Sequence, residues 1–154
     1  MDRKSLLKKI KLDRFIALDF ETTGLSTEKD RIIEVAAILF ENGEPSKRFV
    51  SLVKPILPIP KLIEDITGIT NEMVEHAPSE KDFVDGLFDF IGKNPIVAHN
   101  TPFDLSFLIS LSERYKIDFE KPLCYDTLTL SRTFLFYQPS HNLSSVSEFF
   151  NLSS

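Results

Sequence analysis

A nearly continuous apolar run from Ile32 to Phe40, followed at once by Asn42-Gly43, most restricts how this chain can fold. Such a run is typical of a central strand that is covered on both faces. Asn-Gly is the strongest short hairpin signal, because both residues tolerate a positive φ. The pattern predicts a central strand over residues 32–40 that pairs antiparallel with a second strand over residues 47–54.

The segments around this hairpin predict a layered α/β fold. Residues 15–21 indicate a strand before the hairpin, and the polar residues 22–30 indicate a loop. Further strands are expected at 95–98 and 122–125, and short helical turns at 61–67 and 71–76. Longer helices are expected behind the N-caps Ser79, Thr101 and Asp126, ending near Ile91, Arg114 and Tyr137, and a last short helix is expected to start at Asn142 or Ser144 and end near Phe150. This order predicts a mixed sheet with helices on its faces.

Length and composition narrow the class of protein. The 154 residues suffice for one domain with a substantial core. The single cysteine, Cys124, excludes an internal disulfide and is consistent with a reducing cytoplasm. No apolar run is long enough for a membrane span, and the N-terminus lacks the apolar centre of a signal peptide. A cytoplasmic protein without a membrane partner is expected.

Charge is unevenly distributed along the chain. Residues 1–14 carry six basic and two acidic side chains, net +4, so the remainder carries −9 of the total of −5. An acidic body argues against holding nucleic acid by bulk charge alone, but it allows an enzyme that meets phosphate through metal ions. Residues 1–13 are expected to form a basic lead-in, solvated or touching a phosphate backbone, ahead of a domain at 14–154.

Two carboxylates close the first predicted strand. Asp19 and Glu21 are two positions apart, so they point to the same face with their Cα atoms about 6.5 Å apart. Two acids on one face repel unless a cation lies between them, which predicts a site for Mg²⁺ or Mn²⁺. The alternative is a hydrated strand end. Thr22-Thr23-Gly24 follows with hydroxyls and backbone N–H groups that could meet a phosphate or sugar.

Asp104 is the third candidate ligand. It shares a helical face with Phe107, Leu108 and Leu111, and that face is expected to pack on the sheet. If the helix crosses the first strand, Asp104 joins the other two acids. The structural alternative is an acid that completes a capping box with Thr101.

Other polar side chains divide into two groups. His99 and Asn100 follow a predicted strand, at the edge of the sheet where ligands gather in α/β folds, so both are candidates for the site. Structural roles are favoured for Glu34, with a helper role left open, and for Asp126 and His141. His76 is expected on the surface, and Cys124 is not expected to act as a nucleophile.

Five segments in order resemble one known family, the DnaQ-like (DEDDh) 3′–5′ exonucleases, which are relatives of the epsilon proofreading subunit of DNA polymerase III. The resemblance covers about residues 13–152. The segments are Asp19-Phe-Glu-Thr-Thr-Gly-Leu25, Ile33-Glu34-Val-Ala, Thr67-Gly68-Ile69-Thr70, His99-Asn100-x-x-Phe103-Asp104 and Tyr125-Asp126-Thr127.

The resemblance implies a ribonuclease H-like fold with about five strands. It also implies hydrolysis of the phosphodiester at a 3′ end by two Mg²⁺ or Mn²⁺ ions, with release of nucleoside 5′-monophosphates. By the family pattern Asp19 would bridge both ions, Glu21 would help hold the ion that activates water, and Asp104 would hold the ion nearer the leaving oxygen.

The family pattern also implies contacts with substrate and partners. Thr22, Thr23 and Leu25 match positions that contact the terminal nucleotide, with Gly24 between them, while Ile69 and Phe103 would shape the pocket for base and sugar. The expected substrate is a single-stranded DNA or RNA 3′ end. A polymerase or another replication or repair protein is a possible partner.

Two family residues have no match in the sequence. The family places a histidine, and a few positions later an aspartate, on a helix after the last short helix expected here. His141 and Asp126 match other family positions. We therefore expect a chain truncated at its C-terminal end, without the C-terminal catalytic helix, inactive or impaired by itself, with exposed apolar surface that favours dimerisation.

Two other classes of function compete with the exonuclease. One is a catalytically incomplete module that binds nucleic acid or a polymerase. The other is a structural metal-binding domain, which leaves Thr22-Thr23-Gly24 unexplained.

Overall fold

The computed structural model describes residues 1–152 and confirms the mixed five-stranded sheet, in the order β3-β2-β1-β4-β5. β1 pairs antiparallel with β2 on one side and parallel with β4 on the other, and β4 pairs parallel with β5. The strands are β1 Arg14–Thr22, β2 Ile32–Glu41, β3 Glu44–Leu52, β4 Ile96–Ala98 and β5 Cys124–Asp126.

The hairpin forms at the predicted Asn42-Gly43. Both residues have positive φ, 53° and 86°, as a two-residue turn of this kind requires. Because the turn is so short, Glu44 pairs directly with Glu41, and β3 begins three residues before the predicted Lys47.

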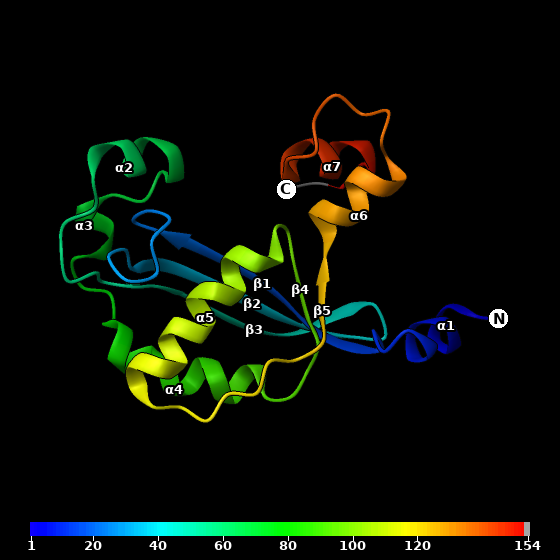
Figure 1. Ribbon diagram of the computed structural model, residues 1–154, viewed down its shortest axis with the longest axis horizontal. Helices are drawn as coiled ribbons and strands as arrows, with labels where there is room; N and C mark the ends of the chain where they lie inside the picture. The colour runs from blue at the N-terminus through cyan, green and yellow to red at the C-terminus, as the bar shows by residue number, and fades with distance from the viewer. Residues whose placement is uncertain (153–154) are drawn as a thin grey trace.

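Helices cover one face of the sheet and extend past both of its ends (Figure 1). α4 and α5 pack against the face that carries Ile16, Leu18 and Phe20, and they complete the main core with Leu87 and Leu108. The helices are α1 Arg3–Lys9, α2 Lys61–Thr67, α3 Asn71–Val74, α4 Glu80–Ile91, α5 Thr101–Tyr115, α6 Thr127–Phe134 and α7 Leu143–Phe149.

The ends of the helices agree with the sequence in most places. Ser79 precedes α4, and its N–H donates to the side chain of Asp82, while Asp126 and Asn142 cap α6 and α7 with their own side chains. α6 is shorter than predicted and ends at Phe134, before the predicted Tyr137.

The start of α5 differs from the prediction. Thr101 is its first residue, and the N-cap is Asn100, in a left-handed conformation (φ 71°, ψ 54°). Asn tolerates this conformation better than other non-glycine residues do, so it can turn the chain sharply from β4 into the helix. The capping box between Thr101 and Asp104, the structural alternative for Asp104, does not form, because the Thr101 hydroxyl donates to backbone carbonyls and Asp104 has another partner.

The basic residues at the N-terminus form the short helix α1, whose side chains are not buried. The segment is nevertheless attached to the sheet: the Tyr125 hydroxyl donates to the Ile10 carbonyl at 2.6 Å, and the Asn42 N–H donates to the Asp13 carbonyl at 2.7 Å. Within residues 1–152, no helix has the length and apolar character needed to cross a membrane.

Leu108 is fully buried between α5 and the sheet. Leu108→Ala is expected to lower the free energy of unfolding by about 2–5 kcal/mol, because it leaves a cavity in a packed core. Urea unfolding followed by circular dichroism measures the change. Leu62→Ala, on the exposed face of α2, is the control and should change stability by about 0.5 kcal/mol or less. Equal losses in both variants would contradict the core described above.

Candidate active site

Asp104 binds the backbone of β1 at the point where its parallel partner strand leaves it. The register of β1 with β4 ends at Ala17 and Val97, and β4 itself ends at Ala98. Further along β1 the N–H of Phe20 points to this vacated side, and it donates to Asp104 Oδ1 at 2.9 Å. The Asp104 side chain is only 2% exposed. The predicted inward orientation of Asp104 is therefore confirmed.

Asp19 and Glu21 flank Phe20 and lie on the other face of β1, as the alternation of the strand predicts. Asp19 is open to solvent, in a hollow of the uncovered sheet face that is also lined by Val97, His99 and Leu143. Glu21 is half-buried and lies directly opposite Glu34 of β2 in the antiparallel register. The strand thus places acids on both sides of the Phe20 N–H that anchors Asp104.

Burial and mutual repulsion raise the pKa values of these three carboxyl groups. Burial raises the pKa of Asp104 to about 7, and the charges of Asp19 and Glu21 add to the rise against the hydrogen bond from Phe20. Partial burial on its inner side also raises the pKa of Asp19, although its outer side is open to solvent, and the electrostatic interaction with His99 offsets part of the rise. Burial raises the pKa of Glu21, and the charges of Asp19 and Glu34 raise it further.

These carboxylates have the chemistry of a site for a hard divalent cation. They are oxygen donors whose negative charges oppose one another, and a cation would relieve that repulsion. Across residues 1–152, no three Asp, Glu, His or Cys side chains are grouped closely enough to enclose an ion. The donor set fits Mg²⁺ or Mn²⁺ in kind, but its arrangement is open and accessible from solvent at Asp19.

The loop after β1 uses its two threonine hydroxyls internally. The Thr22 hydroxyl donates to the Gly24 carbonyl at 2.6 Å, and the Thr23 hydroxyl accepts from the Arg31 N–H at 2.9 Å. The predicted contact of this turn with a phosphate or sugar therefore stays a prediction, with the hydroxyls engaged inside the loop. Each hydroxyl forms a hydrogen bond with a backbone group of the loop that has no partner strand there.

Gly24 is required for space. A Cβ at this position would lie 2.6 Å from Cγ of Asp30, whose carboxylate accepts from the Thr23 hydroxyl and from the Ser26 N–H. Asp30 is a residue that sequence reasoning missed. Its position seven residues after Thr23, just before the apolar strand, was the available signal.

The tip of the loop is free for a ligand. Among the hydrogen bonds of residues 1–152, the backbone N–H groups of Gly24 and Leu25 have no protein acceptor, and the Leu25 side chain is 84% exposed. The loop is fixed from behind, because the Thr27 carbonyl accepts hydrogen bonds from Ser110 and Arg114 of α5. These two N–H groups and the apolar side chain are suited to a phosphate and a base or sugar.

His99 and Asn100 follow the end of β4, and His99 lines the same hollow as Asp19. Both ring nitrogens of His99 are engaged, Nδ1 with the Thr127 hydroxyl at 2.9 Å and Nε2 with the His141 carbonyl at 2.8 Å. A carbonyl only accepts, so Nε2 carries a proton. The Asn100 N–H donates to Asp126, which ties the ends of β4 and β5 together. His99 and Asn100 thus connect the site to the C-terminal helices.

The two predicted pocket residues have different positions. Ile69 is 4% exposed in a small core beneath α2 and α3, together with Ile33, Ile59 and Val74, so its side chain does not face an open pocket. Phe103 is half-buried in the first turn of α5 and packs against Phe107 with 5.1 Å between ring centroids. Of the two, only Phe103 keeps accessible surface near the acids.

The polar residues not assigned to the site have structural contacts or lie on the surface. Asp126 caps α6, His76 lies on the surface, and the thiol of Cys124 donates to the Pro122 carbonyl. His141 contributes its backbone carbonyl to His99, while its ring Nδ1 is buried without a partner among the described residues.

This architecture defines the class. A mixed sheet in the order 3-2-1-4-5, with acids along the central strand, matches the ribonuclease H-like fold of solved exonucleases. The chain matches the RNase T exonuclease family over residues 16–153, and it belongs to that family of DnaQ-like exonucleases. The resemblance seen in the sequence is confirmed.

Named relatives are much longer proteins. The chain is 41% identical over 122 residues to the 3′-5′ exonuclease DinG of Bacillus subtilis, a match that covers 77% of this chain and 13% of DinG. It is 39% identical over 136 residues to the PolC-type DNA polymerase III of Oceanobacillus iheyensis, covering 87% of this chain and 9% of the polymerase. The chain thus spans about a tenth of the length of these curated relatives.

Solved structures agree on the fold. Exonuclease X in complex with a 5′-overhanging DNA duplex is 26% identical with a TM-score of 0.69, and the match covers 91% of this chain and 75% of that one. Escherichia coli exonuclease I in complex with a dT13 oligonucleotide has a TM-score of 0.78 at 20% identity, covering 92% and 36%.

The raised pKa of Asp104 predicts how stability depends on pH. Between its unfolded pKa near 3.9 and its folded pKa of about 7, the folded state binds a proton that the unfolded state has lost, so stability falls as pH rises. In EDTA, Asp104→Asn should remove this loss. The variant should therefore gain at least about 1 kcal/mol relative to wild type between pH 5 and pH 8.

Urea unfolding at both pH values measures this gain. Asp89→Asn makes the same chemical change at an exposed position of α4 and should follow wild type. Parallel pH profiles for wild type and Asp104→Asn would contradict the burial of this carboxyl as an acid.

Proposed function

We propose that this domain removes nucleotides from the 3′ end of a single nucleic-acid strand by metal-dependent phosphodiester hydrolysis. The observation that carries the proposal is the Phe20 N–H···Asp104 hydrogen bond, which fixes an acid of α5 to the backbone between Asp19 and Glu21 of β1. Membership of the exonuclease family supports the reaction class.

Asp19, Glu21 and Asp104 are the residues that would hold the ions. Bound divalent ions polarise phosphoryl oxygens and lower the pKa of water, which supplies the nucleophile. The protein's own contribution is placement. Asp104 is held in place by the hydrogen bond from Phe20 and by its burial. The neighbouring charge of Glu34 repels the charge of Glu21, and a bound cation would relieve that repulsion.

The loop after β1 would orient the terminal nucleotide. The free N–H groups of Gly24 and Leu25 can donate to a phosphate or sugar, and the exposed Leu25 side chain can cover a base or a sugar ring. Asp30 keeps this loop in shape through Thr23 and Ser26, so it acts as a positioning residue.

Nucleic acid with a free 3′ end is the substrate that the comparisons support. DinG is named a 3′-5′ exonuclease, and exonuclease X has been solved in complex with duplex DNA. By similarity to the PolC-type polymerases, we infer that the domain works alongside replication or repair proteins.

We further propose that residues 1–154 alone turn over slowly. No histidine ring of the described residues is exposed beside the acids as a base: His99 has both nitrogens engaged, His76 lies on the surface outside the hollow at Asp19, and the ring Nδ1 of His141 is buried. A general base is worth about 10²–10⁴ in rate, so its absence leaves only slow hydrolysis.

An assay with Mn²⁺ and a single strand tests the proposal. We expect slow release of the labelled mononucleotide from a 3′-labelled strand, while a strand labelled instead at its 5′ end should keep its label on the shortened product. Asp19→Asn should abolish that release, while Asp89→Asn, a surface control, should leave it unchanged.

Two results would contradict parts of this proposal. Unchanged release by Asp19→Asn would remove the carboxylates from catalysis. Rapid turnover by the wild-type 154-residue chain would show that a base is present. If no release is detectable but the strand binds, the chain is the alternative, a nucleic-acid-binding module.

A further inference from the structure

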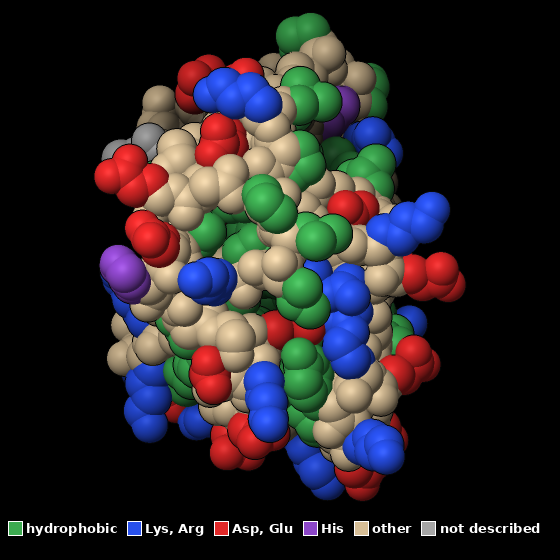
Figure 2. All heavy atoms as spheres, turned by 90° about the vertical axis from the view of Figure 1, so that its left-hand side faces the viewer, with side chains coloured by type: hydrophobic (Ala, Val, Ile, Leu, Met, Phe, Trp, Pro, Cys, Tyr) green, Lys and Arg blue, Asp and Glu red, His purple; other side chains and the backbone are tan. Residues whose placement is uncertain are grey.

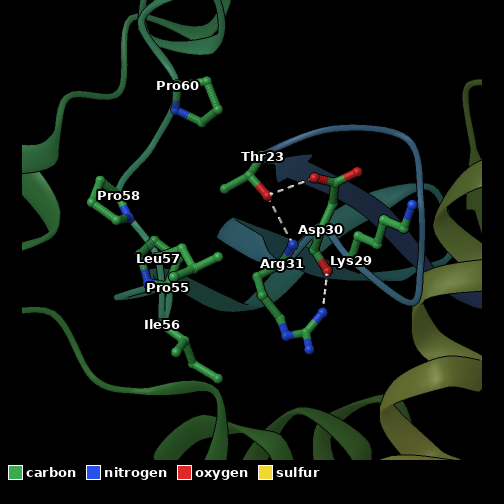
Figure 3. Close-up of a pocket in the computed structure, with 9 residues that line it drawn as sticks. All are labelled: Thr23, Lys29, Asp30, Arg31, Pro55, Ile56, Leu57, Pro58 and Pro60. Carbon is green, nitrogen blue, oxygen red and sulfur yellow. Dashed lines mark hydrogen bonds between the residues drawn. The ribbon is translucent and has the colours of Figure 1, made fainter.

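A groove runs from the loop after β1 along the segment that follows β3. Its first part lies between Thr23, Lys29 and Arg31 on one wall and the proline-rich segment 55–60 on the other (Figure 3). Its second part continues from Arg31 and Ile56 to Lys54 and Lys81. The two hollows share Arg31, Pro55 and Ile56, so they adjoin, and together they are called the groove. The first hollow includes Thr23, the residue before Gly24 of the proposed site.

The groove is positively charged, although the chain carries a net charge of −5. Four basic side chains line it: Lys29, Arg31, Lys54 and Lys81. Among residues 1–152, none of these four forms a salt bridge. Where they do donate hydrogen bonds, the acceptors are neutral backbone carbonyls, those of Glu28 and Asp30 for Arg31 and that of Glu75 for Lys54.

The two acids of the same groove already have partners within the protein, either hydrogen-bond donors or a basic side chain. Asp30 accepts hydrogen bonds from Thr23 and Ser26 of the loop. Glu80 is paired with Arg114 and also accepts from the Tyr115 hydroxyl. The charge left for a ligand is therefore positive, which selects an anion.

The groove also presents apolar surface. Ile56 is 83% exposed, and Leu57, Pro58 and Pro60 line the groove beside it. Figure 2 shows this face of the molecule, with apolar side chains running between basic ones. Cations that can meet phosphates, next to apolar groups that can cover sugars and bases, match a single nucleic-acid strand.

We propose that this groove binds the part of the single strand that precedes its 3′ end, as a polyanion-binding track separate from the catalytic acids. The proposal rests on the proposed function, because the groove is taken to receive the strand whose last nucleotide lies at Gly24 and Leu25. A strand with several phosphates gains from an extended cationic surface, whereas a single released nucleotide does not.

Binding of a 5′-fluorescein-labelled twelve-nucleotide oligothymidylate in EDTA, followed by anisotropy, tests the track without catalysis. The test variant carries Lys29→Gln, Lys54→Gln and Lys81→Gln. The control variant carries Lys47→Gln, Lys93→Gln and Lys121→Gln, exposed lysines outside the groove. Both variants change the net charge from −5 to −8, so bulk charge is matched.

The groove variant should bind at least about tenfold more weakly than wild type, and its plot of log affinity against log salt should be shallower by about 2. The control should stay within about twofold of wild type. With a three-nucleotide probe, the affinities of wild type and the groove variant should differ much less, because the probe is too short to span the groove. Equal affinities of the two triple variants, or no measurable binding by wild type, would overturn the proposal.

A decaglutamate peptide distinguishes the strand from an acidic protein segment. The peptide should compete weakly, and tighter binding of the peptide than of the oligonucleotide would overturn the proposal in favour of a protein partner. Failure of the proposed function is seen separately, because it appears as unchanged nucleotide release by Asp19→Asn whatever the groove variant does.

Discussion

The hydrogen bond from the Phe20 N–H to Asp104 is the contact on which the rest of the site depends. It exists because β4 stops pairing with β1 after Ala17, which leaves the next N–H groups of β1 without a strand partner. The left-handed Asn100 turns the chain at that point, so the first turn of α5 fills the gap. One local break in the sheet thus satisfies a backbone donor and brings an acid from α5 to the acids of β1.

The same arrangement places negative charges in positions where they lower the stability of the folded state. Asp104 is buried, Glu21 faces Glu34 across the strands, and the pKa of each of Asp19, Glu21 and Asp104 is raised. Perturbed acids grouped in one place are typical of functional sites, because folding alone would favour apolar residues there. Packing of the surrounding core and the hydrogen bond from Arg114 to the Thr27 carbonyl compensate for this loss of folding free energy.

The sequence predicted what repeats along the chain and missed what depends on distant contacts. Apolar periodicity and turn residues predicted the sheet, its hairpin and most helices. Strand alternation and the apolar face of a helix predicted the directions in which the side chains of Asp19, Glu21 and Asp104 point. The hydrogen bonds of the Thr23 hydroxyl with Asp30 and Arg31 were not predicted, because these residues come close to Thr23 only when the loop has folded. The groove likewise joins residues 29–31 with 54–60 and 81, which no local pattern connects.

Calorimetric titration of Mn²⁺ shows whether these carboxylates form a cation site, on which the proposed chemistry depends. We expect wild type to bind Mn²⁺ at pH 8 and Asp19→Asn to bind it at least about tenfold more weakly, since one charged oxygen ligand is lost. Binding should also weaken toward pH 6, because Asp104, with a pKa of about 7, then holds a proton. Equal Mn²⁺ affinity of the two proteins would contradict a cation site at Asp19.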